Sequence, residues 1–438
     1  MAKAGDGFRG GDYYRRRTCR ACGSRRVTPF LDLGKMPLAG NFLTKPELGH
    51  ERSYPLRIFF CHDCFLVQVL DVVSPKVLFT DYRYLSSVTT TLREHFEQYA
   101  QDLARSLAKT EDPFVVEIGC NDGVLLAPLR DLDIRALGVE PAANVAAVAR
   151  DRGLDVVEGF FDERLAERIV GSHGLASAVT ASNVFAHIDD LEDVVRGVTA
   201  ILRPNGAFVV EVHHLRELLR GMQYDFFYHE HLCYYSLAAL VPLLDRFGLR
   251  VVDAQPIPIH GGSIRVIARP ASSPHRPSRR LAAMMARERR EGLTSAATYA
   301  RFARRVASRG ARLRKLLLTL KARGKALAGY GAPGRGNTLL GYSKIDRDIL
   351  PYIVDASPSR HGRFTPGSHI PVLPPSEFRK NPPDYALMLA WSYHREILSR
   401  ERPFVRGGGR FIVPLPDLRV VPRAEPLSRP ANTSAIGG

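Results

Sequence analysis

Four consecutive residues in the middle of the chain have side chains suited to acid–base chemistry. Tyr228, His229, Glu230 and His231 place a phenol, two imidazoles and a carboxylate side by side. Imidazoles exchange protons near neutral pH, and a phenol or a carboxylate can orient an imidazole. The cluster follows a strand-like run at 207–212, and open α/β sheets bind ligands at such strand ends. We therefore expect a proton-transfer site, with a surface loop or a metal-binding cluster as the alternatives.

Two pairs of cysteines near the start of the chain predict a metal site. Each pair has two residues between its thiols, and the members are Cys19, Cys22, Cys61 and Cys64. This spacing lets four thiolates bind one tetrahedral Zn²⁺ with no open coordination position, so the predicted metal is structural. Two disulfides are the alternative. The first residues lack the apolar segment of a secretory signal, which favours zinc and a cytoplasmic location.

A third motif predicts the first strand and turn of a nucleotide-binding α/β fold. Residues 115–118 are strand-like and apolar except for Glu117, and an apolar helix start follows the next turn. Glu117 would repel a pyrophosphate but suits the cationic methionine part of S-adenosylmethionine. Glu140 ends the next predicted strand, where an acid can bind ribose hydroxyls. The turn itself carries Gly119, Asn121 and Gly123. Two acids in this order favour a methyltransferase over a dehydrogenase.

Two further strand ends complete the predicted cofactor site. The strand at 154–157 is followed by Phe160, one of two adjacent aromatic residues that can flank an adenine. The strand at 178–181 leads to Asn183. We therefore expect Phe160 and Asn183 to contact S-adenosylmethionine together with the two acids.

Six motifs occur in a fixed order along the chain. They are the paired CxxC knuckles, DYRYLSS (81–87), VEIGCNDG (116–123), NVFAHI (183–188), YHEHLCYYS (228–236) and HGGSIRV (260–266). Over roughly residues 18–422 this set resembles the nucleotide-sugar C-methyltransferases of deoxysugar biosynthesis. The resemblance implies methyl transfer from S-adenosylmethionine to the carbon beside the ketone of a nucleotide-linked 4-keto-deoxysugar. The expected nucleotide is dTDP, and the expected carbon is C-3.

The resemblance also implies roles for individual residues. It makes His231 the base that removes the proton next to the ketone. The other residues that it assigns to this site are Tyr82, His187, Tyr228 and Glu230. The chemistry agrees, because a carbon beside a ketone becomes nucleophilic only after proton removal, and the enolate oxygen then needs hydrogen-bond donors. His229 remains the alternative base, although neighbours in an extended segment point in opposite directions.

A second glycine-rich turn lies at residues 329–334. It spells G-x-G-x-x-G after a strand, and Asp355 follows the next strand, so the motif alone predicts an NAD site. The resemblance instead assigns this turn to the sugar nucleotide. Three competing hypotheses remain: a methyltransferase of the same architecture that acts on another anionic small molecule, an oxidoreductase that uses this turn, and a zinc-containing nucleotide-binding protein without catalytic activity.

The resemblance implies that Tyr330, Arg335 and His260 bind the substrate. The chain departs from the family pattern at two positions: Arg335 stands where relatives usually have lysine, and Ser392 stands where they usually have asparagine. Arginine keeps the positive charge of lysine but not its geometry, so the contact of this residue with the diphosphate is left open.

Composition sets the remaining expectations for this chain of 438 residues. The formal net charge of +17 favours anionic partners, but the arginines are dispersed and no nucleic-acid-binding motif accompanies them. We expect no nucleic-acid partner and no membrane span, and we leave the oligomeric state open. The motifs and the family resemblance, rather than composition, imply an α/β organisation with a zinc-binding domain (18–75), a class I methyltransferase core of Rossmann-like fold (76–270), a helical connector (271–325) and a C-terminal Rossmann-type domain (326–422). We expect a disordered arm (1–17) before these parts and a disordered tail (423–438) after them.

Overall fold

The computed structural model describes residues 11–79 and 85–422, which fall into two compact units. Unit 1 contains the chain up to Ala39 and then Arg52–Ala307. Unit 2 contains Gly40–Glu51 and the chain from Ser308 onward. Among the described helices, none combines the length and the apolar content that crossing a bilayer requires.

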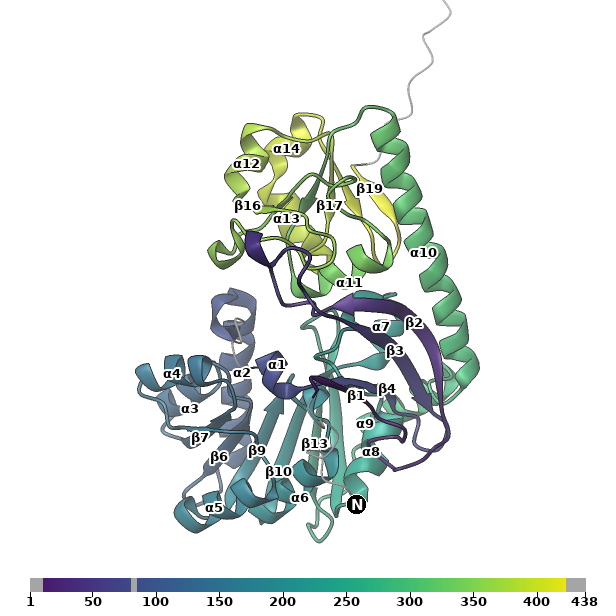
Figure 1. Cartoon of the computed structure of the whole chain (residues 1–438). Helices are drawn as coiled ribbons and strands as arrows, with labels where there is room; N and C mark the ends of the chain where they lie inside the picture. The colour runs from purple at the N-terminus through teal and green to yellow at the C-terminus, as the bar shows by residue number, and fades with distance from the viewer. Residues whose placement is uncertain (1–10, 80–84, 423–438) are drawn as a thin grey trace, which may run out of the picture. The chain divides into compact units, whose positions relative to one another are not determined.

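A seven-stranded sheet forms the centre of unit 1 (Figure 1), in the order β12-β13-β10-β9-β6-β7-β8. The strands are β6 (Phe114–Ile118), β7 (Arg135–Glu140), β8 (Val156–Glu158), β9 (Ala176–Ser182), β10 (Leu202–His213), β12 (Leu249–Ile257) and β13 (Ser263–Pro270). Strands β6 to β10 run parallel, and β13 is antiparallel to both of its neighbours. The order reverses at β6, the position at which such sheets bind ligands. This arrangement confirms the expected class I methyltransferase fold.

Helices cover both faces of this sheet, because alternate residues of each strand point to opposite sides. Val116 and Ile118 belong to one apolar cluster with residues of the helices α5 (Glu163–His173) and α6 (Leu191–Ile201). Val115 belongs to another cluster with α2 (Thr90–Leu107). Burying one such side chain stabilises the fold by about 1.5–3 kcal/mol. The remaining helices of unit 1 are α1 (Pro75–Phe79), α3 (Leu126–Asp131), α4 (Ala143–Asp151), α7 (Leu215–Arg220), α8 (Leu237–Asp245) and α9 (Arg279–Arg290).

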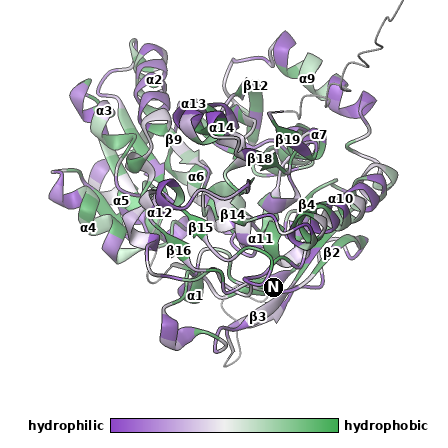
Figure 2. Ribbon diagram, turned by 90° about the horizontal axis from the view of Figure 1, so that it is seen from above, coloured by the Kyte–Doolittle hydropathy of each residue, from purple (hydrophilic) through white to green (hydrophobic). Residues whose placement is uncertain are grey.

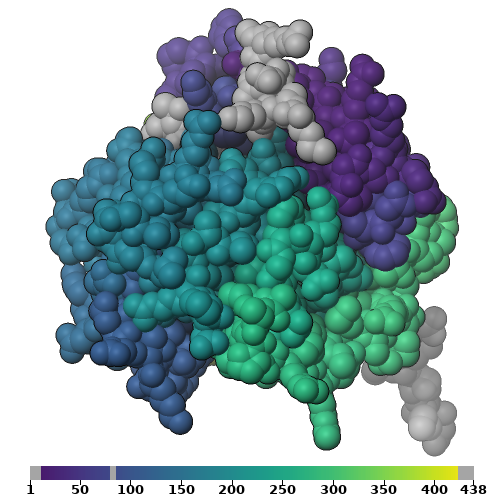
Figure 3. All heavy atoms as spheres, turned by 90° about the horizontal axis from the view of Figure 1, so that it is seen from below, coloured from purple at the N-terminus to yellow at the C-terminus, as the bar shows by residue number. Residues whose placement is uncertain are grey.

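The zinc-binding segment forms a second sheet in unit 1, in the order β11-β4-β3-β2. Its strands are β2 (Val27–Pro37), β3 (Ser53–Cys61), β4 (Val67–Val69) and β11 (Cys233–Tyr234). Strand β11 comes from the methyltransferase part of the chain, and Cys233 pairs with Gln68 of β4. The purple atoms of the N-terminal segment lie directly against the teal and green atoms of the core (Figure 3). The two parts also share one apolar cluster, which includes Cys19, Cys61, Phe185 and Leu232.

The expectation of a disordered arm over residues 1–17 is wrong for Tyr13–Arg15. These residues form β1, which pairs antiparallel with β5 (Asp71–Val73). The hydroxyl of Tyr13 donates a hydrogen bond of 2.7 Å to Asp71. Backbone pairing and this buried carboxylate hold a segment whose basic composition predicted disorder. The tail at 423–438 lies outside the described residues.

Unit 2 contains a six-stranded sheet in the order β16-β15-β14-β17-β18-β19. Its strands are β14 (Leu327–Tyr330), β15 (Ile353–Val354), β16 (Val372–Leu373), β17 (Tyr385–Met388), β18 (Arg410–Val413) and β19 (Arg419–Val421). Only β19 runs antiparallel to its neighbour, so the sheet has the expected Rossmann-type order. The helices of this unit are α11 (Gly334–Tyr342), α12 (Pro375–Lys380), α13 (His394–Arg400) and α14 (Arg402–Arg406).

The two units are not simply consecutive in sequence: the boundary between them falls inside one long helix, and one short segment near the N-terminus belongs to unit 2. Helix α10 (Ala296–Ala322) contributes residues to both units, and Figure 2 shows hydrophilic and hydrophobic residues alternating along it. Its buried residues recur at helical spacing: Tyr299, Phe302, Val306, Leu313, Leu317 and Leu320. The segment 40–51 interrupts the zinc-binding part in sequence but belongs to unit 2, where Leu43 forms an antiparallel bridge with Phe364.

Candidate active site

The four predicted metal ligands converge in unit 1. The ligand atoms of Cys19, Cys22, Cys61 and Cys64 all lie within 4.8 Å of one another. The Sγ atoms of Cys19 and Cys64 are 3.5 Å apart, and those of Cys22 and Cys61 are 3.6 Å apart. All four cysteines are free, so the disulfide alternative does not hold. Sulfurs around a tetrahedral Zn²⁺ with bonds of ~2.3 Å lie at about this spacing, so the residues present fit the ion.

Glu117 is a buried carboxylate that forms no ion pair with any of the residues that the structure describes. It stands next to the last residue of β6 and is only 2% exposed. Burial, followed by the negative charges of Glu140, Asp122 and Glu211, raises the pKa of Glu117 well above its usual value. Its Oε2 atom has no hydrogen-bond partner among the described residues. Because an unpaired buried carboxylate is costly, this position fits the cationic end of S-adenosylmethionine.

Glu140 ends β7 and retains room for further donors. Its Oε2 atom accepts from the Asn121 N–H at 3.0 Å, and its Oε1 atom accepts from the Ala142 N–H at 2.9 Å. A carboxylate offers about four lone-pair sites, so one site is left on each oxygen. Two free sites on two oxygens match the two hydroxyls of a ribose.

The turn between β6 and α3 adopts backbone conformations that favour glycine and asparagine. Gly119, Asn121 and Gly123 have φ angles of +66°, +51° and +78°. A Cβ atom at Gly119 would approach Val184 to 2.6 Å, so only glycine fits there. The Oδ1 atom of Asn121 accepts from the Ser86 N–H at 2.8 Å, which brings the end of the DYRYLSS motif to this turn.

Phe160 and Asn183 lie in the loops after β8 and β9. The N–H of Gly159, next to Phe160, donates to the Glu140 carbonyl at 3.0 Å, and the Phe160 side chain is 54% exposed. Asn183 has a φ of +59°, and its N–H donates to the Glu211 carbonyl at 2.8 Å. Both loops therefore follow strand ends on the carboxyl edge of the sheet that bears Glu117.

His231 lies in a cluster of aromatic and imidazole side chains. Its Nε2 atom is 2.7 Å from the Tyr228 hydroxyl, and its ring centroid is 4.8 Å from that of His187. Burial is the main cause that lowers the pKa of His231 well below its usual value, and the imidazoles of His187, His213 and His260 lower it further. Burial also lowers the pKa of His187 to about 4. Both imidazoles are therefore neutral at pH 7.

His229 has a different environment from His231. It is 1% exposed, whereas His231 is half-buried. Its Nε2 atom lies 3.3 Å from the backbone carbonyls of Tyr54 and Pro55 in β3. A carbonyl oxygen can only accept a hydrogen bond, so Nε2 of His229 is the donor. This hydrogen bond connects the YHEH segment to the zinc-binding sheet.

The structure gives less detail on the other residues that were predicted to lie in this site. Tyr82 lies outside the described residues. The backbone of Glu230 forms a hydrogen bond with His187, so this residue reaches the cluster through its main chain. His260 has a φ of +52° in the turn between β12 and β13 and lies near enough to His231 to affect its pKa.

Three family models match this chain in sequence order. A "Putative zinc binding domain" matches residues 19–79, a "Methyltransferase domain" matches residues 92–254, and a "C-methyltransferase C-terminal domain" matches residues 258–416. C-methyltransferase NovU of Streptomyces niveus is 39% identical over 404 residues, which cover 92% of this chain and 96% of that protein.

This chain belongs to the C-methyltransferases. It is an S-adenosylmethionine-dependent enzyme with an N-terminal zinc-binding domain. A ubiquinone biosynthesis O-methyltransferase of Methylobacterium sp. (strain 4-46) is 33% identical over 95 residues, which cover 22% of this chain and 38% of that protein. The structure of the PH0226 protein from Pyrococcus horikoshii OT3 matches with a TM-score of 0.35 and 16% identity, covering 43% of this chain and 94% of that one.

The second glycine turn of this C-methyltransferase has a different set of contacts. In unit 2, Asp355 accepts from the Ala332 N–H at 2.6 Å, from the Ser357 N–H at 2.8 Å and from Arg360 at 3.2 Å. Two of these donors share Oδ1, so a free site remains only on Oδ2. Asp355 is therefore poorly suited to hold both hydroxyls of an NAD ribose.

Tyr330 in this turn and Arg335 in the following helix were both predicted to bind the substrate, and they contact different side chains. The Tyr330 hydroxyl donates to Glu401 at 2.7 Å, and the residue is buried, so it packs inside unit 2. Arg335 donates to Ser392 Oγ at 2.6 Å, and its guanidinium lies 4.7 Å from the Trp391 ring centroid. The two departures from the family pattern therefore contact each other.

Sequence reasoning missed His213, which ends β10 and contributes to the His231 cluster. Its ring centroid is 4.3 Å from that of Phe226. The available signal was its position directly after the strand at 207–212, on the edge where the other site residues follow their strands.

Proposed function

We propose that this C-methyltransferase methylates the carbon beside the ketone of a nucleotide-linked 4-keto-deoxysugar, with His231 as the base. The observation that carries the proposal is the neutral His231 imidazole, whose Nε2 atom lies 2.7 Å from the Tyr228 hydroxyl. His231 is half-buried, whereas His229 is buried. The sugar, its dTDP carrier and the C-3 position rest on the motif resemblance.

The first step is proton removal from the carbon. A neutral imidazole of His231 takes the proton, and the electrons of the C–H bond form the enolate of the ketone. The Tyr228 hydroxyl gives the resulting imidazolium a hydrogen-bond partner. His187 stays neutral because burial lowers its pKa, so it can donate to the enolate oxygen without adding a second positive charge.

The second step forms the new carbon–carbon bond. S-adenosylmethionine, when bound, supplies the methyl group and leaves as S-adenosylhomocysteine. Glu117 and Glu140 would hold its cationic and ribose ends on the carboxyl edge of the sheet. His231 then returns its proton to water, so the enzyme regains its starting state.

A labelling experiment tests the proposal. The enzyme would be incubated with a panel of nucleotide ketosugars and ¹³C-methyl S-adenosylmethionine, and NMR would locate the label. We expect a C-methyl group beside the ketone of a dTDP-linked sugar. Label on oxygen, or on a substrate without a ketone, would contradict the proposal.

Exchange in D₂O tests the base separately. With S-adenosylhomocysteine in place of the methyl donor, the wild-type enzyme should exchange the substrate proton for deuterium. His231→Asn should abolish this exchange, whereas His229→Asn should retain it. Retained exchange in His231→Asn would show that another group is the base.

A further inference from the structure

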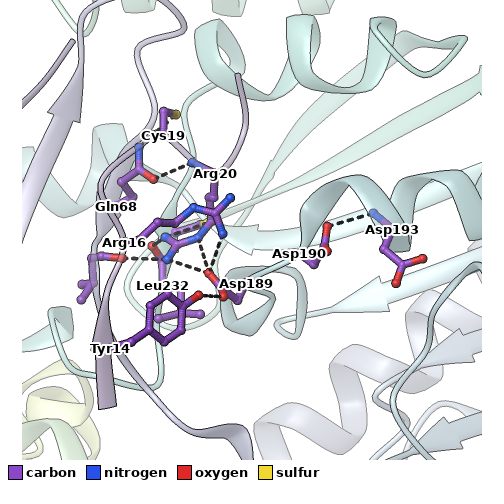
Figure 4. Close-up of polar contacts among 11 residues, drawn as sticks. Tyr14, Arg16, Cys19, Arg20, Gln68, Asp189, Asp190, Asp193 and Leu232 are labelled. Carbon is purple, nitrogen blue, oxygen red and sulfur yellow. Dashed lines mark hydrogen bonds and ion pairs between the residues drawn. The ribbon is translucent and has the colours of Figure 1, made fainter. Parts of the chain in front are cut away.

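Arg20 lies inside the first zinc knuckle, between Cys19 and Cys22, but its side chain reaches into the methyltransferase core. The side chain is 0% exposed. It donates to the Leu232 carbonyl at 2.5 Å and to the Val69 carbonyl at 2.8 Å, and it forms an ion pair of 3.2 Å with Asp189 (Figure 4). One guanidinium therefore joins two core segments that are far apart in sequence.

Both core segments flank imidazoles of the candidate site. Leu232 directly follows His231, and Asp189 lies two residues after His187. The Leu232 N–H donates to the Ala186 carbonyl at 2.8 Å, so the two segments also contact each other beside Arg20. A shift of Arg20 would therefore move the backbone next to both His231 and His187.

The zinc ligands hold the other end of Arg20. The backbone N–H of Arg20 donates to Gln68 Oε1 at 3.1 Å, and Gln68 Nε2 donates to Cys19 Sγ at 3.0 Å. Gln68 also pairs with Cys233 in the register of β4 and β11. Zinc ligation by Cys19 and Cys22 would fix the backbone on both sides of Arg20.

Asp189 is itself held on several sides. It accepts from Tyr14 of β1 and from Arg16 at 3.3 Å. The next residue, Asp190, accepts from the Asp193 N–H at 3.1 Å and so caps α6 (Figure 4). Removing one partner from a buried ion pair leaves an uncompensated charge, which destabilises this local arrangement.

We propose that Arg20 is a positioning residue that transmits the geometry of the zinc knuckle to His231 and His187. This inference rests on the proposed function, in which His231 is the base. Zinc ligation fixes Arg20, and Arg20 fixes the Leu232 carbonyl and the Asp189 carboxylate on either side of the imidazole pair. The zinc-binding domain thereby takes part in aligning the base with the substrate carbon.

Variants of Arg20 in the full-length zinc-loaded enzyme test this role. In Arg20→Met, kcat should fall about 10- to 100-fold, since a misplacement of ~1 Å can cost that much, with little change in S-adenosylmethionine affinity. Arg20→Lys keeps the charge but not the fork of donors, so its loss should be intermediate. The matched control is Arg26→Met, because Arg26 is 72% exposed and pairs with Asp63 in the same domain. This control should behave as wild type.

Two readouts separate positioning from general stability. Hydrogen exchange of residues 228–235 should be faster in Arg20→Met and after zinc chelation, and unchanged in Arg26→Met. The acid limb of kcat/KM should move upward in pH, because water entry relieves the burial that lowers the pKa of His231. Within the described part of the chain, the titratable groups that face His231 are Tyr228, His187, His213, Tyr234 and His260.

A second variant decides the matter if Arg20→Met does not fold or does not retain zinc. Asp189→Asn leaves the four cysteines and Arg20 itself unchanged but removes the ion pair of Arg20, so it should lower kcat in the same direction. Wild-type kcat and hydrogen exchange in zinc-loaded Arg20→Met, or in Asp189→Asn, would overturn the inference. His231→Asn is measured in parallel: if it methylates at the wild-type rate, the base is wrong, whereas its inactivity beside an unaffected Arg20→Met rejects only the positioning role.

Discussion

Each of the two units of this enzyme contains a glycine-bearing turn after a parallel strand, but the two turns differ in their carboxylates. In unit 1, counting only the residues that the structure describes, Glu117 has an oxygen without a partner, and Glu140 retains a lone pair on each oxygen. In unit 2, Asp355 is occupied by two N–H groups and Arg360. The difference teaches that the free acceptor sites of the nearby acid, more than the spacing of glycines, indicate whether a turn of this type can bind a ribose.

The largest expected effect concerns the proposed base in unit 1. His231→Ala should lower kcat by ~10²–10⁴-fold, the usual contribution of a positioned base. His229→Ala should lower it much less, since His229 contacts backbone carbonyls of β3. Steady-state kinetics with the ketosugar would measure both. Equal losses in the two variants would remove the distinction between these imidazoles.

The pH profile of the wild-type enzyme sharpens this prediction. A base acts in its neutral form, and burial lowers the pKa of His231, so the base should remain active below pH 6.5. The acid limb of kcat/KM should therefore lie below that pH. A limb above pH 7 would point to a different group.

The next effect concerns the acids of the first turn. Glu140→Ala should weaken S-adenosylmethionine binding by about 1.5–3 kcal/mol, the value of a hydrogen bond to a charged group. Asp355→Ala should leave that affinity unchanged. Titration calorimetry would compare the two variants, with NAD as a control ligand. Tight NAD binding that Asp355→Ala abolishes would reverse the comparison.

Glu117 should make cofactor binding depend on pH. Its raised pKa increases the fraction of the free enzyme in which Glu117 is protonated at a given pH. A cationic ligand favours the ionised form of this carboxyl group. Affinity for S-adenosylmethionine should therefore fall as pH decreases, and Glu117→Gln should remove this dependence. An unchanged pH dependence in Glu117→Gln would show that another group titrates.

The smallest effect concerns the second turn. Arg335→Lys should destabilise unit 2 by about 1 kcal/mol, because it loses the hydrogen bond to Ser392 and the planar contact with Trp391. Adding Ser392→Asn, which restores the pair usual in the family, should recover part of this loss. Denaturant unfolding of the single and double variants would measure the coupling. Strict additivity would mean that the two positions act independently.

Local patterns in the sequence predicted the first strands of the methyltransferase core, the four cysteine ligands and the glycine turns, whereas the Rossmann-type sheet of unit 2 was implied by the family resemblance. Each locally predicted feature is encoded within a few residues, by strand periodicity or by fixed spacing. Long-range pairing was not predictable in this way. The two-residue strand β11 gives too short a pattern to reveal its partner β4, and the Leu43 bridge to Phe364 joins positions with no local signal. Arg20 lay within a recognised motif, but nothing nearby indicated its contact with Leu232.

Strand β11 has a consequence for any attempt to separate the zinc-binding domain from the enzyme. Without Cys233 and Tyr234, the fragment 18–75 would leave the outer edge of β4 unpaired, and Val67–Val69 is fully buried in the intact unit. An exposed apolar strand edge recruits strands from other molecules. Such a fragment should self-associate even when loaded with zinc, and a chimaera that exchanges this domain between relatives must carry the matching β11 with it.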